Sequence, residues 1–259
     1  MHQLLIKGRH ICKVSGILFD KDGTLINSEP RLLLLAKSRK ELAKKFFQQE
    51  KYTPSDVTML DKLLSKAYGL VDDCIDPNGS IAIASRSNNL ISTATIFCLL
   101  GKSWSKSVAL ASEIFDQVSK QSFLMNPTEE NREDLLPGIV EFLKESGKRK
   151  VKLGIISNDS RDGIQKFLER NKLVDQFSFY WSSEDIPPKP NPNAIKQLCK
   201  IINLNISECA LIGDSDTDLK MAKMAGSAVA IGYTAGWKKL PLLYEHDHLI
   251  SHWNELSFQ

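Results

Sequence analysis

Two acidic residues, Asp20 and Asp22, stand two positions apart directly after the apolar run 14–19 (VSGILF). A short apolar run bounded by charged residues is typical of a buried strand in a parallel sheet. In an extended chain, side chains two positions apart point the same way, so both carboxylates are expected on one side and Lys21 on the other. Gly23 supplies the backbone freedom for a sharp turn just beyond them. The pattern predicts two carboxylates sharing one site at the end of a strand.

A second acidic group, formed by Asp214, Asp216 and Asp218, follows the apolar run 209–213 (CALIG). It is expected to open onto the same edge of the sheet. Carboxylates this close repel one another, so either a divalent cation neutralises them or one is held protonated. Ligation by oxygen alone favours Mg²⁺ over Zn²⁺.

Acidic residues in such patterns also occur in calcium loops and in solvated turns. A calcium loop is rejected for the second group, because Leu219 and Ala225 stand where its glycine and its final glutamate belong. The remaining alternative for Asp20 and Asp22 is a pair of solvated turn acids. The apolar strand on one side and Gly-Thr on the other favour the shared site.

Strand and helix patterns alternate along most of the chain. Further apolar runs occur at 151–156, 177–181, 209–213 and 227–231, and helical patterns occur at 137–146, 160–171, 191–203 and 216–225. This alternation implies right-handed βαβ units. It predicts an α/β fold with a doubly wound, Rossmann-like parallel sheet, which binds ligands at the carboxyl ends of its strands.

One long gap interrupts the alternation. About 130 residues separate the first two strands, whereas a βαβ unit needs about 30. Within the gap the signals are helical: residues 53–56 (TPSD) match an N-cap followed by proline, and Gly69 stands where a C-cap belongs. The sequence therefore predicts a catalytic core at 1–26 and 132–259, with an inserted all-helical cap domain at 27–131.

Residues 20–24 (DKDGT) resemble the D-x-D-G-T signature of the phosphatase branch of the haloacid dehalogenase superfamily. Three further motifs of that family occur in its order: Ser157 after the run 151–156, Lys189 before Pro190, and Gly213-Asp214 followed by Asp218. Each motif alone is weak, since Ser157-Asn158 also suits a helix cap and a Lys-Pro pair is usually exposed. Four motifs in the correct order make coincidence improbable. The inserted helices are similar to the cap of phosphoglycolate phosphatase-like members.

The resemblance implies a Mg²⁺-dependent phosphoric monoester hydrolase that acts on a small substrate, phosphoglycolate-like or a sugar phosphate. The implied metal ligands are Asp20, Asp22 through its backbone carbonyl, Asp214, and Asp218 through the metal's waters. The implied substrate-binding residues are Gly23, Thr24, Ser157, Asn158 and Lys189.

In the implied mechanism, Asp20 attacks phosphorus to form an aspartyl-phosphate. Asp22 protonates the leaving alkoxide and then deprotonates the hydrolytic water, which predicts a bell-shaped dependence of rate on pH. The catalytic residues are thus Asp20, Asp22 and Lys189, whose ammonium, together with Mg²⁺, offsets the repulsion between nucleophile and phosphate.

Arg86 is a further candidate substrate-binding residue. It lies in the polar stretch 85–89, which we interpret as a loop between cap helices, and it is a candidate cation for a carboxylate-bearing substrate. The alternative is a solvated loop charge.

Two rival functions use the same residues. A sugar-phosphate mutase or other phosphotransferase would also phosphorylate Asp20 but pass the phosphoryl group to a second sugar hydroxyl. A non-catalytic, phosphate-binding regulatory protein would only accept phosphate there. The presence of Asp22, Ser157, Lys189 and Asp214 argues against the second rival.

Composition restricts the other partners. The 259 residues carry 34 basic and 31 acidic side chains, a net charge of +3, too small and dispersed to indicate binding to nucleic acid or a membrane surface.

Five cysteines without a C-x-x-C pair suit reduced thiols. Charged residues interrupt the apolar N-terminus, so neither a secretory leader nor a membrane helix is expected, and we expect a cytoplasmic location. The oligomeric state, monomer or dimer, stays open.

Overall fold

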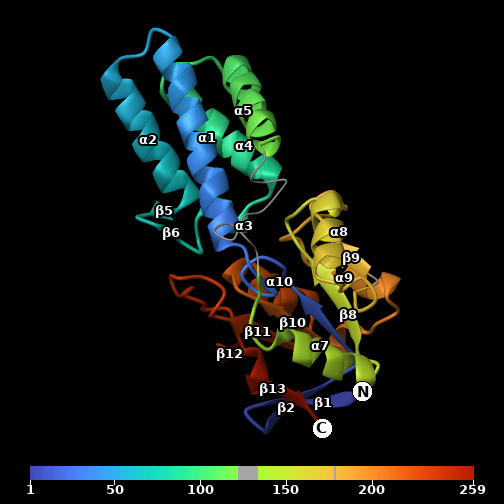
Figure 1. Ribbon diagram of the computed structural model, residues 1–259. Helices are drawn as coiled ribbons and strands as arrows, with labels where there is room; N and C mark the ends of the chain where they lie inside the picture. Colours follow the sequence, from blue (N-terminus) through green and yellow to red (C-terminus); the bar gives the residue numbers. More distant parts are fainter. Residues whose placement is uncertain (122–133, 178) are drawn as a thin grey trace. The chain divides into compact units, whose positions relative to one another are not determined.

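A computed structural model, in which residues 1–121, 134–177 and 179–259 are described, shows a mixed α/β protein (Figure 1). The chain divides into two compact units. The first, which we call the core unit, is formed by Met1–Asn27 together with Asp134–Gln259, and the second, the inserted unit, by Ser28–Glu133. The role of the inserted unit as a cap stays a prediction.

The core unit is built on a six-stranded sheet. Its strand order is β12 (His248–Ile250), β11 (Val229–Tyr233), β10 (Cys209–Gly213), β3 (Gly16–Phe19), β8 (Lys152–Ile156) and β9 (Phe179–Trp181). Every neighbouring pair in it is parallel. Strand β3 lies between β10 and β8, so the segments that follow these three strands leave the sheet at the same edge.

Helices pack on both faces of this sheet, which confirms the predicted doubly wound fold. They are α7 (Ile139–Lys148), α8 (Arg161–Arg170), α9 (Pro192–Ile201) and α10 (Asp216–Ala225). Side chains of β3 alternate between the faces: Ile17 and Phe19 join a cluster with α7 and α8, and Leu18 joins one with α9 and α10. All three are fully buried, and burying each such side chain contributes about 1.5–3 kcal/mol. Burial on two faces explains why this run is apolar without interruption.

A second, antiparallel sheet joins the two ends of the chain, and the sequence patterns did not predict it. It has the order β13 (Leu256–Phe258), β1 (His2–Ile6), β2 (Arg9–Val14). Aromatic rings connect it to the main sheet: Phe142 of α7 stacks on Phe258 at 5.4 Å between centroids and on Trp253 at 5.6 Å. Two short 3₁₀ helices directly precede strands of the core unit, Ile206–Glu208 before β10 and Trp253–Glu255 before β13.

The chain leaves and re-enters the core unit through one two-stranded ladder. Strands β4 (Ile26–Asn27) and β7 (Asp134–Leu135) pair antiparallel, with Ile26 opposite Leu135 and Asn27 opposite Asp134. The backbone N–H of Leu136 also donates to the carbonyl of Leu25 at 3.0 Å. The two ends of the insertion are therefore fixed side by side.

The inserted unit is mainly helical. Its described elements are α1 (Glu29–Gln49), α2 (Pro54–Tyr68), β5 (Leu70–Val71), β6 (Cys74–Ile75), α3 (Ser80–Ile83), α4 (Arg86–Leu99) and α5 (Trp104–Ser119). The predicted helix start is confirmed: Thr53 is the N-cap, Pro54 is the first helical residue, and Thr53 and Asp56 form a capping box in which the Thr53 N–H donates to the Asp56 carboxylate at 2.9 Å. Among the described residues, no helix combines the length and the apolar character that crossing a bilayer requires.

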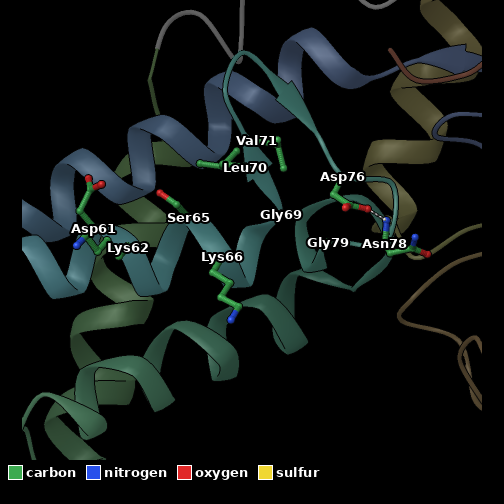
Figure 2. A pocket seen from close by; sticks show the side chains of 10 residues that line it. All are labelled: Asp61, Lys62, Ser65, Lys66, Gly69, Leu70, Val71, Asp76, Asn78 and Gly79. Carbon is green, nitrogen blue, oxygen red and sulfur yellow. Dashed lines mark hydrogen bonds between the residues drawn. The ribbon is translucent and has the colours of Figure 1, made fainter. Parts of the chain in front are cut away.

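The end of α2 and the turn that follows it line a cavity of about 560 Å³ in the inserted unit (Figure 2). Gly69 is the C-cap of α2, with φ +78°. It lies against Gly79, and a Cβ atom at Gly69 would come within 2.6 Å of the Gly79 Cα. The turn is therefore held closed by contact between two glycines.

This contact predicts that Gly69→Ala destabilises the inserted unit more than a positive φ alone explains. Gly101→Ala is the matched control, because Gly101 also has a positive φ, +96°, but an added Cβ meets nothing within 4 Å. Both variants should lose about 1 kcal/mol through backbone strain, and Gly69→Ala about 1–3 kcal/mol more through the clash. Urea denaturation followed by circular dichroism measures both losses, and equal losses would contradict the prediction.

Candidate active site

The carboxyl ends of β3 and β10 bring two distant acids together. Asp20 directly follows β3 and Asp214 directly follows β10. The strands pair in register, Phe19 opposite Ile212, and the Asp20 N–H donates to the Ile212 carbonyl at 2.9 Å. The register thus sets the two carboxylates side by side at the edge of the sheet.

Asp218 joins them from the first turn of α10. Its backbone N–H donates to the N-cap hydroxyl of Ser215 at 3.3 Å, and that hydroxyl donates to the Asp218 Oδ2 at 2.7 Å. Oxygens of Asp20, Asp214 and Asp218 lie within 4.8 Å of one another, and the three residues are 7%, 4% and 3% exposed. The structure therefore brings together three of the predicted site residues.

Lys189 supplies the positive charge in this cluster. Its Nζ lies 2.6 Å from the Asp20 Oδ1 and 2.5 Å from the Asp218 Oδ1, and it donates to the Ile156 carbonyl at 3.2 Å. Although burial acts against its charge, these two carboxylates raise the pKa of Lys189 above its usual range. Lys189 is thus a fixed ammonium in contact with the candidate nucleophile.

One ammonium does not balance three buried carboxylates. Burial raises the pKa of Asp20 to about 6, while Lys189 opposes the rise. Burial, followed by the charges of Asp20 and Asp218, raises the pKa of Asp214 well above its usual range. If all three carboxyl groups are ionised, the three carboxylates and the Lys189 ammonium together carry a net charge of −2. The atoms that could bind a metal are all carboxylate oxygens. This charge and donor set fit a hard divalent cation such as Mg²⁺.

Trp237 is a site residue that no sequence pattern indicated. Its Nε1 donates to the Asp214 Oδ2 at 2.5 Å, and the Thr24 hydroxyl donates to the Asp214 Oδ1 at 3.3 Å. A Cβ atom at Gly23 would collide with both the Trp237 ring nitrogen and the Asp214 carboxylate. Trp237 follows β11, which lies next to β10 in the sheet. That adjacency was the only signal that could have placed Trp237 beside Asp214.

The expected direction of Lys21 is wrong. The Lys21 Nζ lies 2.9 Å from the Asp22 Oδ1 instead of pointing away from it. Strand β3 ends at Phe19, and the chain then turns, with the Leu25 N–H donating to the Lys21 carbonyl at 2.9 Å. The alternation of side chains along a strand therefore does not reach these residues.

The predicted phosphate-binding residues lie in the segments that follow β3 and β8. Ser157 directly follows β8 and is buried, with its hydroxyl accepting from the Asp159 N–H at 3.1 Å; Asn158 comes next. The amides of Gly23 and Thr24 donate to backbone carbonyls, at 2.9 Å and 3.4 Å. Substrate binding by these four residues stays a prediction.

The interpretation of Arg86 as a loop residue is wrong. It is the first residue of α4, because the Ser85 hydroxyl accepts from the Asn88 N–H and caps the helix. Its half-exposed guanidinium pairs with Asp116 at 2.6 Å and lies 5.5 Å from the centroid of the Phe115 ring. Its predicted role in binding substrate stays a prediction.

Comparisons with known proteins find relatives by sequence and by fold. The chain is 27% identical over 145 residues to a phosphoglycolate phosphatase of Vibrio vulnificus (strain CMCP6), a match that covers 54% of this chain and 63% of that relative. A crystal structure of a predicted phosphoglycolate phosphatase from Haemophilus somnus 129PT has a TM-score of 0.65 at 20% identity, over 94% of this chain and 96% of that one. A structure from Thermotoga maritima described as a β-phosphoglucomutase has a TM-score of 0.58 at 16% identity, over 93% and 95%.

These matches carry different weight. The structural likeness, at 16–20% identity, shows the fold, and the chain spans less than two thirds of the length of the relative from Vibrio vulnificus. The model of one family, described as haloacid dehalogenase-like hydrolase, matches residues 14–226, which include all four motifs. The chain therefore belongs to the haloacid dehalogenase-like hydrolase family, as those motifs predicted.

Proposed function

We propose that this protein is a Mg²⁺-dependent phosphatase that hydrolyses a small phosphomonoester through an aspartyl-phosphate on Asp20. The observation that carries the proposal is the contact of 2.6 Å between the Lys189 ammonium and the Asp20 carboxylate, beside two further buried acids. A nucleophile, a fixed cation and a set of oxygen ligands are the parts that phosphoryl transfer to a carboxylate requires.

Asp20, Asp214 and Asp218 are the residues that would hold Mg²⁺, together with the backbone carbonyl of Asp22. Bound Mg²⁺ would supply positive charge that neutralises the phosphoryl oxygens and permits an anion to attack them. Trp237 and Thr24 donate to the two oxygens of Asp214 and so fix the orientation of this ligand.

The chemical steps use side chains of this chain. Lys189 reduces the repulsion between the Asp20 carboxylate and the phosphate dianion. An Asp20 oxygen bonds to phosphorus while the ester P–O bond breaks, and Asp22 gives its proton to the leaving alkoxide. Asp22 then takes a proton from water, whose oxygen attacks phosphorus, releasing phosphate and restoring the Asp20 carboxylate.

Phosphoglycolate is the first substrate to test, since the relative from Vibrio vulnificus is a phosphoglycolate phosphatase. A sugar-phosphate mutase is the second candidate, because the same nucleophile serves both reactions and the structure described as a β-phosphoglucomutase shares the fold. Release of free phosphate, measured with and without a sugar-phosphate acceptor, separates them. A phosphatase releases phosphate from its substrate without the acceptor, whereas a mutase does not turn over.

Asp20→Asn should reduce phosphate release below about 1% of the wild-type rate, because the amide cannot serve as the nucleophile. Circular dichroism should show an unchanged fold. Asp162→Asn is the control, since Asp162 lies on α8 with an exposed side chain paired to Lys166, and this variant should keep full activity. Turnover of several per cent by Asp20→Asn would reject the nucleophile assignment.

Mg²⁺ affinity should weaken as pH falls through about 6. The pKa of Asp20 is raised to about 6, so below this pH the carboxyl takes up a proton that Mg²⁺ must displace. Titration calorimetry at pH 5 and pH 7, in buffers of different ionisation enthalpy, should show weaker binding and more proton release at pH 5. Equal affinity and no proton release at both values would contradict a Mg²⁺ site on this carboxylate.

Gly23→Ala should weaken Mg²⁺ binding by about tenfold or more, because the new Cβ displaces Trp237 or the Asp214 carboxylate. Gly8→Ala is a closely matched control: Gly8 has the same φ of +76°, but nothing lies within 4 Å of an added Cβ. Both variants carry the backbone strain, and only Gly23→Ala should lose metal affinity and activity. Calorimetry and phosphate release measure the two effects, and parallel losses in both variants would contradict the argument.

A further inference from the structure

Lys21 is a buried lysine for which the mechanism above has no role. It is 2% exposed, although its position between the two acids of the first motif predicted a side chain pointing away from them. Its ammonium lies 2.9 Å from the Asp22 Oδ1 and 3.1 Å from the Asp159 Oδ2, and 5.7 Å from the centroid of the Phe167 ring. Lys21 therefore joins the loop after β3 to the loop after β8.

Asp159 is a fixed anchor for this ammonium. Its Oδ1 accepts from the Ser160 N–H at 2.7 Å, at the start of α8, where a negative charge is favoured by the helix dipole. A Cβ atom at Gly163 would collide with both carboxylate oxygens, so the first turn of α8 leaves room for this side chain only because residue 163 is glycine. The backbone of Asp159 is also held, by bonds to the Ser157 hydroxyl at 3.1 Å and the Ser183 N–H at 2.9 Å.

The Asp22 carboxylate is one of the two partly exposed ends of this chain of charges, the other being Asp159, whose side chain is 29% exposed. The Asp22 side chain is 19% exposed, compared with 2% for Lys21. Lys21 contacts the Oδ1 of this carboxylate. The contact matters because a carboxyl group that transfers a proton must present one oxygen to the leaving group in a constant direction. A buried ammonium in contact with two carboxylates provides such a constraint, because breaking either contact costs free energy in a site that water does not reach.

We propose that Lys21, anchored by Asp159, is a positioning residue that orients the Asp22 carboxyl group for proton transfer and links it to the loop that carries Ser157. This inference rests on the proposed phosphatase function and on Asp22 as its acid. Lys21 is buried and does not itself bind the phosphate. Its loss should therefore lower the rate of the step that Asp22 assists and leave substrate binding largely intact.

The test compares two leaving groups. An alkyl phosphomonoester that the wild type hydrolyses needs a proton on its departing alkoxide, whereas p-nitrophenyl phosphate releases a stable anion that needs none. Lys21→Met removes the ammonium and keeps the length of the side chain. It should lower kcat/KM for the alkyl ester by about 10- to 100-fold and for p-nitrophenyl phosphate by less than about threefold. KM for the alkyl ester should change little, and Asp22→Asn should show the same preference more strongly.

Three further variants separate positioning from a general loss of structure. Lys21→Arg keeps the charge and should recover part of the lost rate. Asp159→Asn should show the same leaving-group pattern as Lys21→Met, and the double variant should be no slower than Lys21→Met alone, because the two residues act as one unit. Lys166→Met, which changes an exposed lysine on α8, should behave as the wild type. If Lys21→Met does not fold, Asp159→Asn carries the same test.

Several outcomes would overturn the inference. Equal losses for both substrates, fully additive losses in the double variant, or wild-type kinetics of Lys21→Met would each reject positioning of Asp22. These outcomes leave the phosphatase function standing, because the wild type still hydrolyses both esters. A wild type that hydrolyses neither ester in the presence of Mg²⁺ would instead reject the proposed function.

Discussion

Repulsion between buried carboxylates is the constraint on which the rest of the core unit depends. At separations within 4.8 Å, two unit charges repel by about 3 kcal/mol or more at an effective dielectric constant of about 20. Strand register forces Asp20 and Asp214 together, and the start of α10 adds Asp218. Lys189 compensates part of this charge. The cluster is therefore stable only if a divalent cation supplies further positive charge or if one of the carboxyl groups is protonated.

The surroundings of the cluster restrict its geometry from several elements. Trp237, after β11, and Thr24 hold the two oxygens of Asp214, while Lys189 holds Asp20 against β8 through the Ile156 carbonyl. Each of these side chains comes from a loop at the same edge of one parallel sheet. The rigid sheet thus sets the distances, and the loops supply the chemistry.

The sequence predicted those parts of the structure that depend on local signals. The strand at 209–213 and the helix at 216–225 were predicted to the residue, because an apolar run, a serine N-cap and a glycine at the C-cap mark their limits. The terminal strands β1, β2 and β13 were missed, since charged residues such as Arg9 and Lys13 interrupt their pattern. Arg86 was assigned to a loop because a short polar run conceals the capped start of α4. The direction of Lys21 was wrong because β3 ends at Phe19, directly before Asp20. Trp237 depends on tertiary contacts alone.

The ladder between β4 and β7 has a consequence for how this architecture diversifies. The inserted unit begins and ends at two paired strands of two residues each, so its removal or replacement leaves the register of the main sheet untouched. Segments of very different length can be inserted at this junction, because the ladder fixes only the positions of their two ends. Natural variation can therefore alter the inserted unit while the acids and the lysine of the core unit keep their positions.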